Sequence, residues 1–82
     1  MTFTVKFFAR LREELATAEV RVALADVTTL AQLKPFLIGQ YPHWQTALER
    51  NLLLAVNQNL VNGDLTLQVG DEVALFPPVT GG

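Results

Sequence analysis

The end of the chain holds the residues that could carry chemistry, in the run Pro77, Pro78, Val79, Thr80, Gly81 and Gly82. Because glycine has no side chain, this end could enter a narrow cleft of another protein and present the α-carboxylate of Gly82 there. A carboxylate is a poor electrophile until it is activated, and the sequence contains no Gly-rich phosphate loop that would bind a nucleotide. Activation must then come from another protein, and we interpret the tail as a substrate offered to a partner's active site.

The alternative is that the terminal Gly81-Gly82 pair is a frayed end without a role, as many chain ends are. Against this, the preceding Pro77-Pro78 pair stiffens the exit from the last expected strand. A tail of six residues can also reach roughly 20 Å when extended. These features favour a delivered tail. We therefore predict one domain over residues 1–76 and an extended, flexible tail over residues 77–82.

Two aromatic residues, Phe8 and Phe76, interrupt the alternation of the strands expected around them. Each falls on the face that otherwise carries polar side chains, such as Lys6 and Glu72. If the first and last strands are neighbours, the two rings lie close together and offer a docking patch, since one aromatic side chain can bury about 150–250 Å². Two other interpretations remain open: a helix covers this face, or each ring is a single exposed aromatic, which is common.

The remaining polar residues do not suggest a catalytic or metal site. His43 is the only histidine and cysteine is absent, so we expect no metal. The adjacent Glu13 and Glu14 read as solvated surface, and Trp44 as a packing residue. We expect a chain that is not catalytic by itself.

The composition indicates a single packed domain of 82 residues, with 50% hydrophobic and 17% charged residues. The net charge is −2 and the six Lys and Arg residues are scattered, so no basic stripe predicts binding to nucleic acid. No apolar run approaches the 18 or so residues that would cross a bilayer. The start of the chain lacks a signal-peptide pattern, and without cysteine no disulfides form. We expect a cytoplasmic protein with no membrane partner.

The elements that would position the tail begin with two alternating segments, residues 2–9 and 19–24, which predict strands. Val20, Val22 and Leu24 would face inward in the second. Residues 10–16 between them predict a short helix, because Leu11 and Leu15 lie four apart. The two strands would form a hairpin.

The strongest helix signal follows Thr29, which forms a capping-box pattern with Gln32. Pro35 falls inside this helix and should remove a backbone hydrogen bond, so we predict a bent or two-part helix. Gly39 suits the position just after the helix end. The stripe facing the core would be Leu30, Leu33 and Leu37.

The second half of the chain predicts short elements separated by turns. A short helix is expected over residues 43–50 and a strand over 52–56. A turn at 57–59, a short strand at 60–61 and a turn at Asn62-Gly63 follow. Alternation continues over 65–69, and the last strand covers 72–76. The order β-β-α-β-β-β predicts an α+β grasp fold, a mixed sheet with one main helix packed across one face.

Three segments of this sequence resemble the family of small, sulfur-carrier subunits of molybdopterin synthase. They are VKFFARLREEL at 5–15, LLLAVNQNLV at 52–61 and GDEVALFPPVTGG at 70–82. The resemblance spans the whole chain and is strongest over residues 53–82, whereas residues 16–50 match mainly by pattern. The ending DEVA-aromatic-PPV-x-GG is far more specific than two glycines alone.

The resemblance implies a ubiquitin-like β-grasp fold and a mechanism. An E1-like adenylyltransferase would use Mg-ATP to convert the Gly82 carboxylate to an acyl-adenylate. A sulfur donor would then supply the sulfur of a thiocarboxylate. The charged tail would enter the large subunit, where its sulfur attacks cyclic pyranopterin monophosphate. Two carriers would supply the two dithiolene sulfurs, in a heterotetramer of two small and two large subunits. This chain would bind no cofactor itself.

Carried onto this sequence, the resemblance makes Gly81 and Gly82 the reactive tail. It also implies a hydrophobic docking surface and a stem that contacts the partner, formed by Phe8, Leu60, Phe76, Pro77, Pro78, Val79 and Thr80. Leu60 enters only through the resemblance. Three alternatives remain: a sulfur carrier of the thiamine-pathway type, a ubiquitin-like protein modifier, or an inert β-grasp interaction module.

Overall fold

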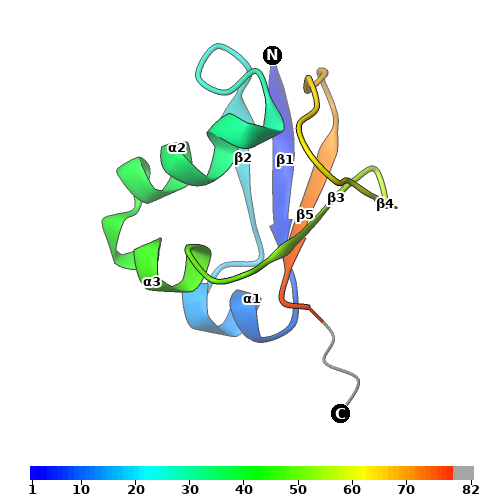
Figure 1. Cartoon of the computed structure of the whole chain (residues 1–82). Helices are drawn as coiled ribbons and strands as arrows, with labels where there is room; N and C mark the ends of the chain where they lie inside the picture. The colour runs from blue at the N-terminus through cyan, green and yellow to red at the C-terminus, as the bar shows by residue number, and fades with distance from the viewer. Residues whose placement is uncertain (79–82) are drawn as a thin grey trace.

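The computed structural model describes residues 1–78, which form a five-stranded mixed sheet with helices packed against one face (Figure 1). The strand order is β2-β1-β5-β3-β4. The elements are β1 (Thr2–Phe7), α1 (Ala9–Leu15), β2 (Glu19–Ala23), the 3₁₀ turn η1 (Leu30–Gln32), α2 (Leu33–Gln40), the 3₁₀ turn η2 (Pro42–Trp44), α3 (Gln45–Leu48), β3 (Leu53–Val56), β4 (Asn59–Leu60) and β5 (Glu72–Phe76). The predicted α+β arrangement is confirmed.

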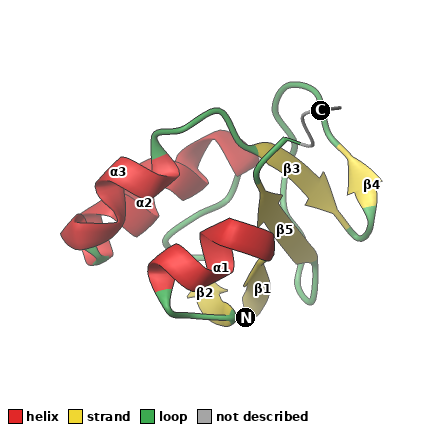
Figure 2. Cartoon of the chain, turned by 90° about the horizontal axis from the view of Figure 1, so that it is seen from below, coloured by secondary structure: helices red, strands yellow, loops and turns green. Residues whose placement is uncertain are grey.

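The pairing of β1 makes the sheet mixed. β1 runs antiparallel to β2, as the predicted hairpin requires, and parallel to β5. A parallel pair needs a long crossover, and here residues 8–71 supply it and include all the helices. The first and last strands are therefore neighbours, which brings the end of β1 beside the end of β5. Figure 2 shows α2 and α3 on one side of the molecule and β4 on the opposite side.

The predicted two-part helix is confirmed, since η1 precedes α2. The Oε1 atom of Gln32 accepts hydrogen bonds from the backbone N–H groups of Thr28 and Thr29, at 2.8 and 3.3 Å. Pro35 is the third residue of α2, within the first turn, where backbone N–H groups have no partner inside the helix. The division into a 3₁₀ turn and an α-helix therefore accommodates the proline without an interior break.

The predicted role of Gly39 is wrong. The α-helix continues through Gly39 to Gln40 and is capped by Tyr41, and positive φ among the described glycines occurs only at Gly63 and Gly70. The helix ends before Pro42, whose ring cannot continue it because it lacks the N–H donor.

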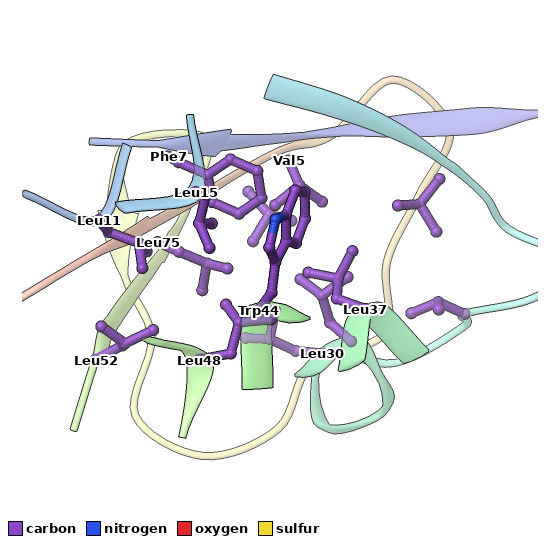
Figure 3. Close-up of a cluster of buried hydrophobic side chains, with 14 of the residues drawn as sticks. Val5, Phe7, Leu11, Leu15, Leu30, Leu37, Trp44, Leu48, Leu52 and Leu75 are labelled. Atoms are coloured by element: carbon purple, nitrogen blue, oxygen red, sulfur yellow. The ribbon is translucent and has the colours of Figure 1, made fainter. Parts of the chain in front are cut away.

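The core lies between the helices and the inner face of the sheet (Figure 3). The indole of Trp44 is buried there, and its centroid lies 5.4 Å from that of Phe7 in an edge-to-face contact. Tyr41 stacks on the outer side of this cluster, 4.1 Å from Trp44. The predicted helix stripe and most of the inward strand residues are buried, among them Phe3, Val5, Phe7, Val22, Leu30, Leu33, Leu37, Val73 and Leu75. Val20 and Leu24, also predicted to face inward, are partly buried and pack against this core.

The alternation over residues 65–69 does not produce a strand. Only one bridge forms in this segment, between Thr66 and Thr29, and Leu67 alone among its apolar residues is buried. Leu65 and Val69 are 38% and 60% exposed. The segment pairs with the residues that precede η1 and not with the sheet. One buried side chain, that of Leu67, therefore holds it against the core. Within residues 1–78, no helix is long and apolar enough to cross a membrane.

Candidate functional site

An apolar groove of about 470 Å³ lies on the sheet face that points away from the helices, where β5 ends. It is built from the end of β1, the start of α1 and the outward-facing residues of three strands. The lining residues are Phe8, Ala9, Ala55, Gln58, Leu60, Glu72, Ala74, Phe76 and Pro77. Four of these are residues that the sequence predicted to contact a partner.

The floor of the groove consists of small side chains. Ala55 of β3 lies opposite Ala74 of β5 on one side and opposite Leu60 of β4 on the other. Ala55 is buried, yet it does not belong to the main hydrophobic core. Since alanine projects little above the sheet, the larger side chains around the floor leave a depression between them. Neither alanine was predicted from the sequence as part of a site, although their outward parity between bulky residues was a usable signal.

Phe8 forms one wall because β1 ends just before it. Its backbone is extended, with φ −127° and ψ 160°, at the residue that caps α1, and its N–H donates to the carbonyl oxygen of Leu75 at 3.2 Å. The side chain is 43% exposed. Phe76, at the end of β5, is half-buried opposite Leu53 of β3. The predicted proximity of Phe8 and Phe76 is therefore confirmed, since both line one groove.

Leu60 forms the other wall and is the most exposed of the large groove side chains, at 66%. It lies on β4, which follows a tight turn in which Asn57 and Gln58 have φ of 50° and 71°. Positive φ at both central residues is typical of the type I′ hairpin turn. An exposed leucine beside two partly exposed aromatic rings makes a contiguous apolar surface suited to a protein partner.

Charge borders the apolar surface at one point. The Nζ atom of Lys6 lies 3.3 Å from Oε1 of Glu72, and each side chain is 37% exposed. An ion pair this exposed contributes little to stability. Its position on the sheet face next to the groove instead adds a polar edge, which can set the orientation of a docked partner.

The start of the predicted tail lies at the groove. Pro77 lines it and Pro78 is exposed, whereas Val79, Thr80, Gly81 and Gly82 lie outside the described residues. The structure thus brings Phe8, Leu60, Phe76 and Pro77 together around the point where the chain leaves β5. The reactive end itself stays a prediction.

Other polar candidates lie away from the groove. His43 is exposed in η2, and Trp44 is a buried core residue as predicted. Within residues 1–78, no group of three or more His, Cys, Asp or Glu side chains could hold a metal ion.

Residues 5–82 match the ThiS family. The chain belongs to this family. One relative is the molybdopterin synthase sulfur carrier subunit of Escherichia coli K12, which is 51% identical over 79 residues that cover 95% of this chain and 96% of that protein. The protein of the same name from Haemophilus influenzae is 38% identical, with 95% and 96% covered.

This ThiS family member is also similar to a solved structure, that of small archaeal modifier protein 1 from Haloferax volcanii. The identity is 28% and the TM-score 0.81, with the whole of both chains covered. The predicted ubiquitin-like β-grasp fold and the family resemblance read from the sequence are both confirmed.

Proposed function

We propose that this ThiS family member is the sulfur-carrier subunit of a molybdopterin synthase. The observation that carries the proposal is the apolar groove at the root of the tail, where Phe8, Leu60 and Phe76 surround the exit of the chain at Pro77. A carrier needs such a surface, because its reactive end must be delivered into an active site that it does not contain. The similarity in sequence to the two bacterial carrier subunits supports the same function.

The reaction begins at the carboxylate of Gly82. One carboxylate oxygen attacks the α-phosphate of Mg-ATP on an E1-like adenylyltransferase, pyrophosphate leaves, and an acyl-adenylate forms. A donor then supplies sulfur at the oxidation level of sulfide, which attacks the acyl carbon, so that AMP leaves and Gly82 carries a thiocarboxylate. On the large subunit this nucleophile attacks a carbon of cyclic pyranopterin monophosphate, and a C–S bond forms as an oxygen substituent leaves that carbon. Hydrolysis of the acyl bond leaves the sulfur on the pterin and regenerates the Gly82 carboxylate for another cycle.

The groove and the tail have different roles in the proposed function. The groove supplies binding energy through buried apolar surface, while residues 77–82 can span roughly 20 Å when extended. The Pro77-Pro78 pair restricts the direction in which the tail leaves the sheet, which lowers the entropy lost when the tail enters a cleft. Gly81 and Gly82 allow the reactive carbonyl to pass through a narrow channel.

The partners of the proposed carrier are the large synthase subunit, the adenylyltransferase and a sulfur donor. The synthase is a heterotetramer of two small and two large subunits, and two charged carriers supply the two sulfurs of one dithiolene. We place the protein in the cytoplasm. The chain binds neither ATP nor Mg²⁺ itself, because the activating enzyme holds both.

Intact-mass analysis tests the proposal. The purified chain is incubated with the adenylyltransferase, Mg-ATP and a sulfur donor, and its mass should rise by about 16 Da as sulfur replaces one oxygen of the activated acyl group. The charged chain, mixed with the large subunit and cyclic pyranopterin monophosphate, should then yield molybdopterin. Deletion of Gly81-Gly82 and addition of one alanine after Gly82 are the matched controls, and both should block charging. Full charging of either control would contradict the mechanism.

Two other functions use the same activated tail. The likeness to a small archaeal modifier protein favours conjugation, in which a lysine amine of a target attacks the acyl-adenylate. A thiamine-pathway carrier would deliver its sulfur to a different acceptor enzyme. Isolation of the chain from its native host distinguishes them: covalent adducts with many proteins indicate a modifier, and the large protein that copurifies identifies the acceptor.

A further inference from the structure

A set of hydrogen bonds ties the β3–β4 turn to the start of β5. The N–H of Asn57 donates to the carbonyl oxygen of Glu72 at 2.8 Å, and the N–H of Glu72 donates to Oδ1 of Asn57 at 3.0 Å. Nδ2 of Asn57 donates to Oδ1 of Asp71 at 2.9 Å. The other carboxylate oxygen of Asp71 accepts from the N–H of Gln68 at 2.8 Å. We call Asn57 and Asp71 the turn clamp.

Besides the turn clamp, few contacts hold this hairpin: the N–H of Val61 donates to the carbonyl oxygen of Leu54 at 3.0 Å, and the Val61 side chain packs against the core. The strand β4 pairs with β3 at two positions, Ala55 with Leu60 and Val56 with Asn59, and it is one of the two edge strands of the sheet. Short two-stranded ribbons are marginal in water without further contacts. β5, in contrast, lies between β1 and β3 and carries the fully buried Val73 and Leu75. The clamp therefore connects a weakly held strand to a firmly held one.

Neither member of the turn clamp lines the groove, but the residue that directly follows each of them does. Gln58 follows Asn57, Glu72 follows Asp71, and both reach the groove together with Leu60. We propose that Asn57 and Asp71 are positioning residues for partner docking, which act through Leu60 by holding it over the alanine floor. This inference rests on the proposed function, since the partner is the large subunit of the synthase.

The polarity of the turn clamp can be reversed. Asn57→Asp keeps an acceptor for the N–H of Glu72 and keeps a residue that tolerates positive φ, but it removes the donor and sets two carboxylates against each other. Adding Asp71→Asn restores complementarity. The new amide at position 71 donates to the new carboxylate at position 57, and its oxygen still accepts from the N–H of Gln68. The double variant also has the net charge of the natural chain.

The test measures the dissociation constant for the purified large subunit by calorimetric titration, together with the thermal midpoint of each free variant. Asn57→Asp should weaken binding about tenfold, or about 1.4 kcal/mol. The double variant should bind within about threefold of the natural chain. In a Leu60→Ala background, Asn57→Asp should cost less than about threefold, because residues that act through one another are not additive.

Three results would overturn the inference: unchanged binding by folded Asn57→Asp, no recovery in the double variant, or a full tenfold loss in the Leu60→Ala background. A merely structural role would give that additive loss. If Asn57→Asp does not fold, Asp71→Asn alone takes its place. Its amide offers one acceptor oxygen to two donors, Nδ2 of Asn57 and the N–H of Gln68, so one of these hydrogen bonds is lost without a like-charge pair. Failure of the natural chain to bind the large subunit would overturn the proposed function as well. If the natural chain binds and Asn57→Asp binds equally well, only the inference about the turn clamp is overturned.

Discussion

Truncation of Leu60 to alanine should weaken docking of the large subunit while leaving the free fold intact. Leu60 is the groove residue best suited to separate these effects, because 66% of it is exposed in the free chain. It also lies on the edge strand β4, whose pairing with β3 involves backbone atoms that the substitution does not remove.

The size of the effect follows from the exposed fraction. Complete burial of a leucine side chain contributes about 1.5–3 kcal/mol. Since 66% of Leu60 is exposed, ~1–2 kcal/mol of this becomes available only when a partner covers the groove. Loss of that energy raises the dissociation constant about 5- to 30-fold. The part already buried contributes less than about 1 kcal/mol to folding.

Calorimetric titration against the large subunit measures the first quantity, and thermal unfolding of the free chain measures the second. Val69→Ala is the matched control, because Val69 is 60% exposed but does not line the groove. That variant should bind as the natural chain does. Leu60→Ala should lower the midpoint by less than about 8 °C, the shift that corresponds to 1 kcal/mol in a domain of this size.

Two outcomes would refute the reasoning. If Leu60→Ala and Val69→Ala bind equally well, the groove is not the docking surface. If Leu60→Ala lowers the unfolding midpoint by much more than about 8 °C, Leu60 supports the fold of the free chain and its effect on docking cannot be assigned to contact with the partner.

Three further substitutions test other parts of the molecule. Phe76→Ala should weaken binding of the large subunit by more than tenfold, as expected for an aromatic at the centre of an interface, and cost less than about 2 kcal/mol of stability; a larger stability loss with unchanged titration would make Phe76 a core residue. Ala16 caps α1 with φ 53°, so Ala16→Gly should increase the free energy of unfolding by about 0.5–1 kcal/mol and raise the urea midpoint. A lower midpoint would contradict this conformation. Leu75 is fully buried, and Leu75→Ala should cost about 2–5 kcal/mol in the same urea experiment; a loss below about 1 kcal/mol would contradict its place in the core.

The sequence was sufficient for the features that depend on neighbouring residues. The alternation of β1 and β5 predicted which of their side chains are buried, because successive strand residues point to opposite faces. The glutamine at position 32 predicted the helix start, and Pro35 predicted its division into two parts. Trp44 was correctly assigned to the core. The ending at residues 70–82 was specific enough to indicate the family.

Local pattern failed where contacts distant in sequence decide the structure. The alternation over 65–69 would suit a strand, but the segment pairs with Thr29 at the entrance of η1 and has no strand neighbour in the sheet. Gly39 has the residue type of a helix end, yet the chain remains helical until Pro42 is near. In both cases the residues permit more than one conformation, and packing selects among them.

The amino-acid sequence by itself determined the faces of the central strands, the capped helix and the unusual composition of the tail. Only the tertiary structure decided that a groove exists. Phe8, Leu60 and Phe76 come from three distant segments, and they meet because β5 inserts between β1 and β3 over a floor of two alanines. Periodicity specifies which way a side chain points, since that depends on backbone geometry within one strand. Which strands become neighbours, and in what register, depends on the free energy of the whole packed core.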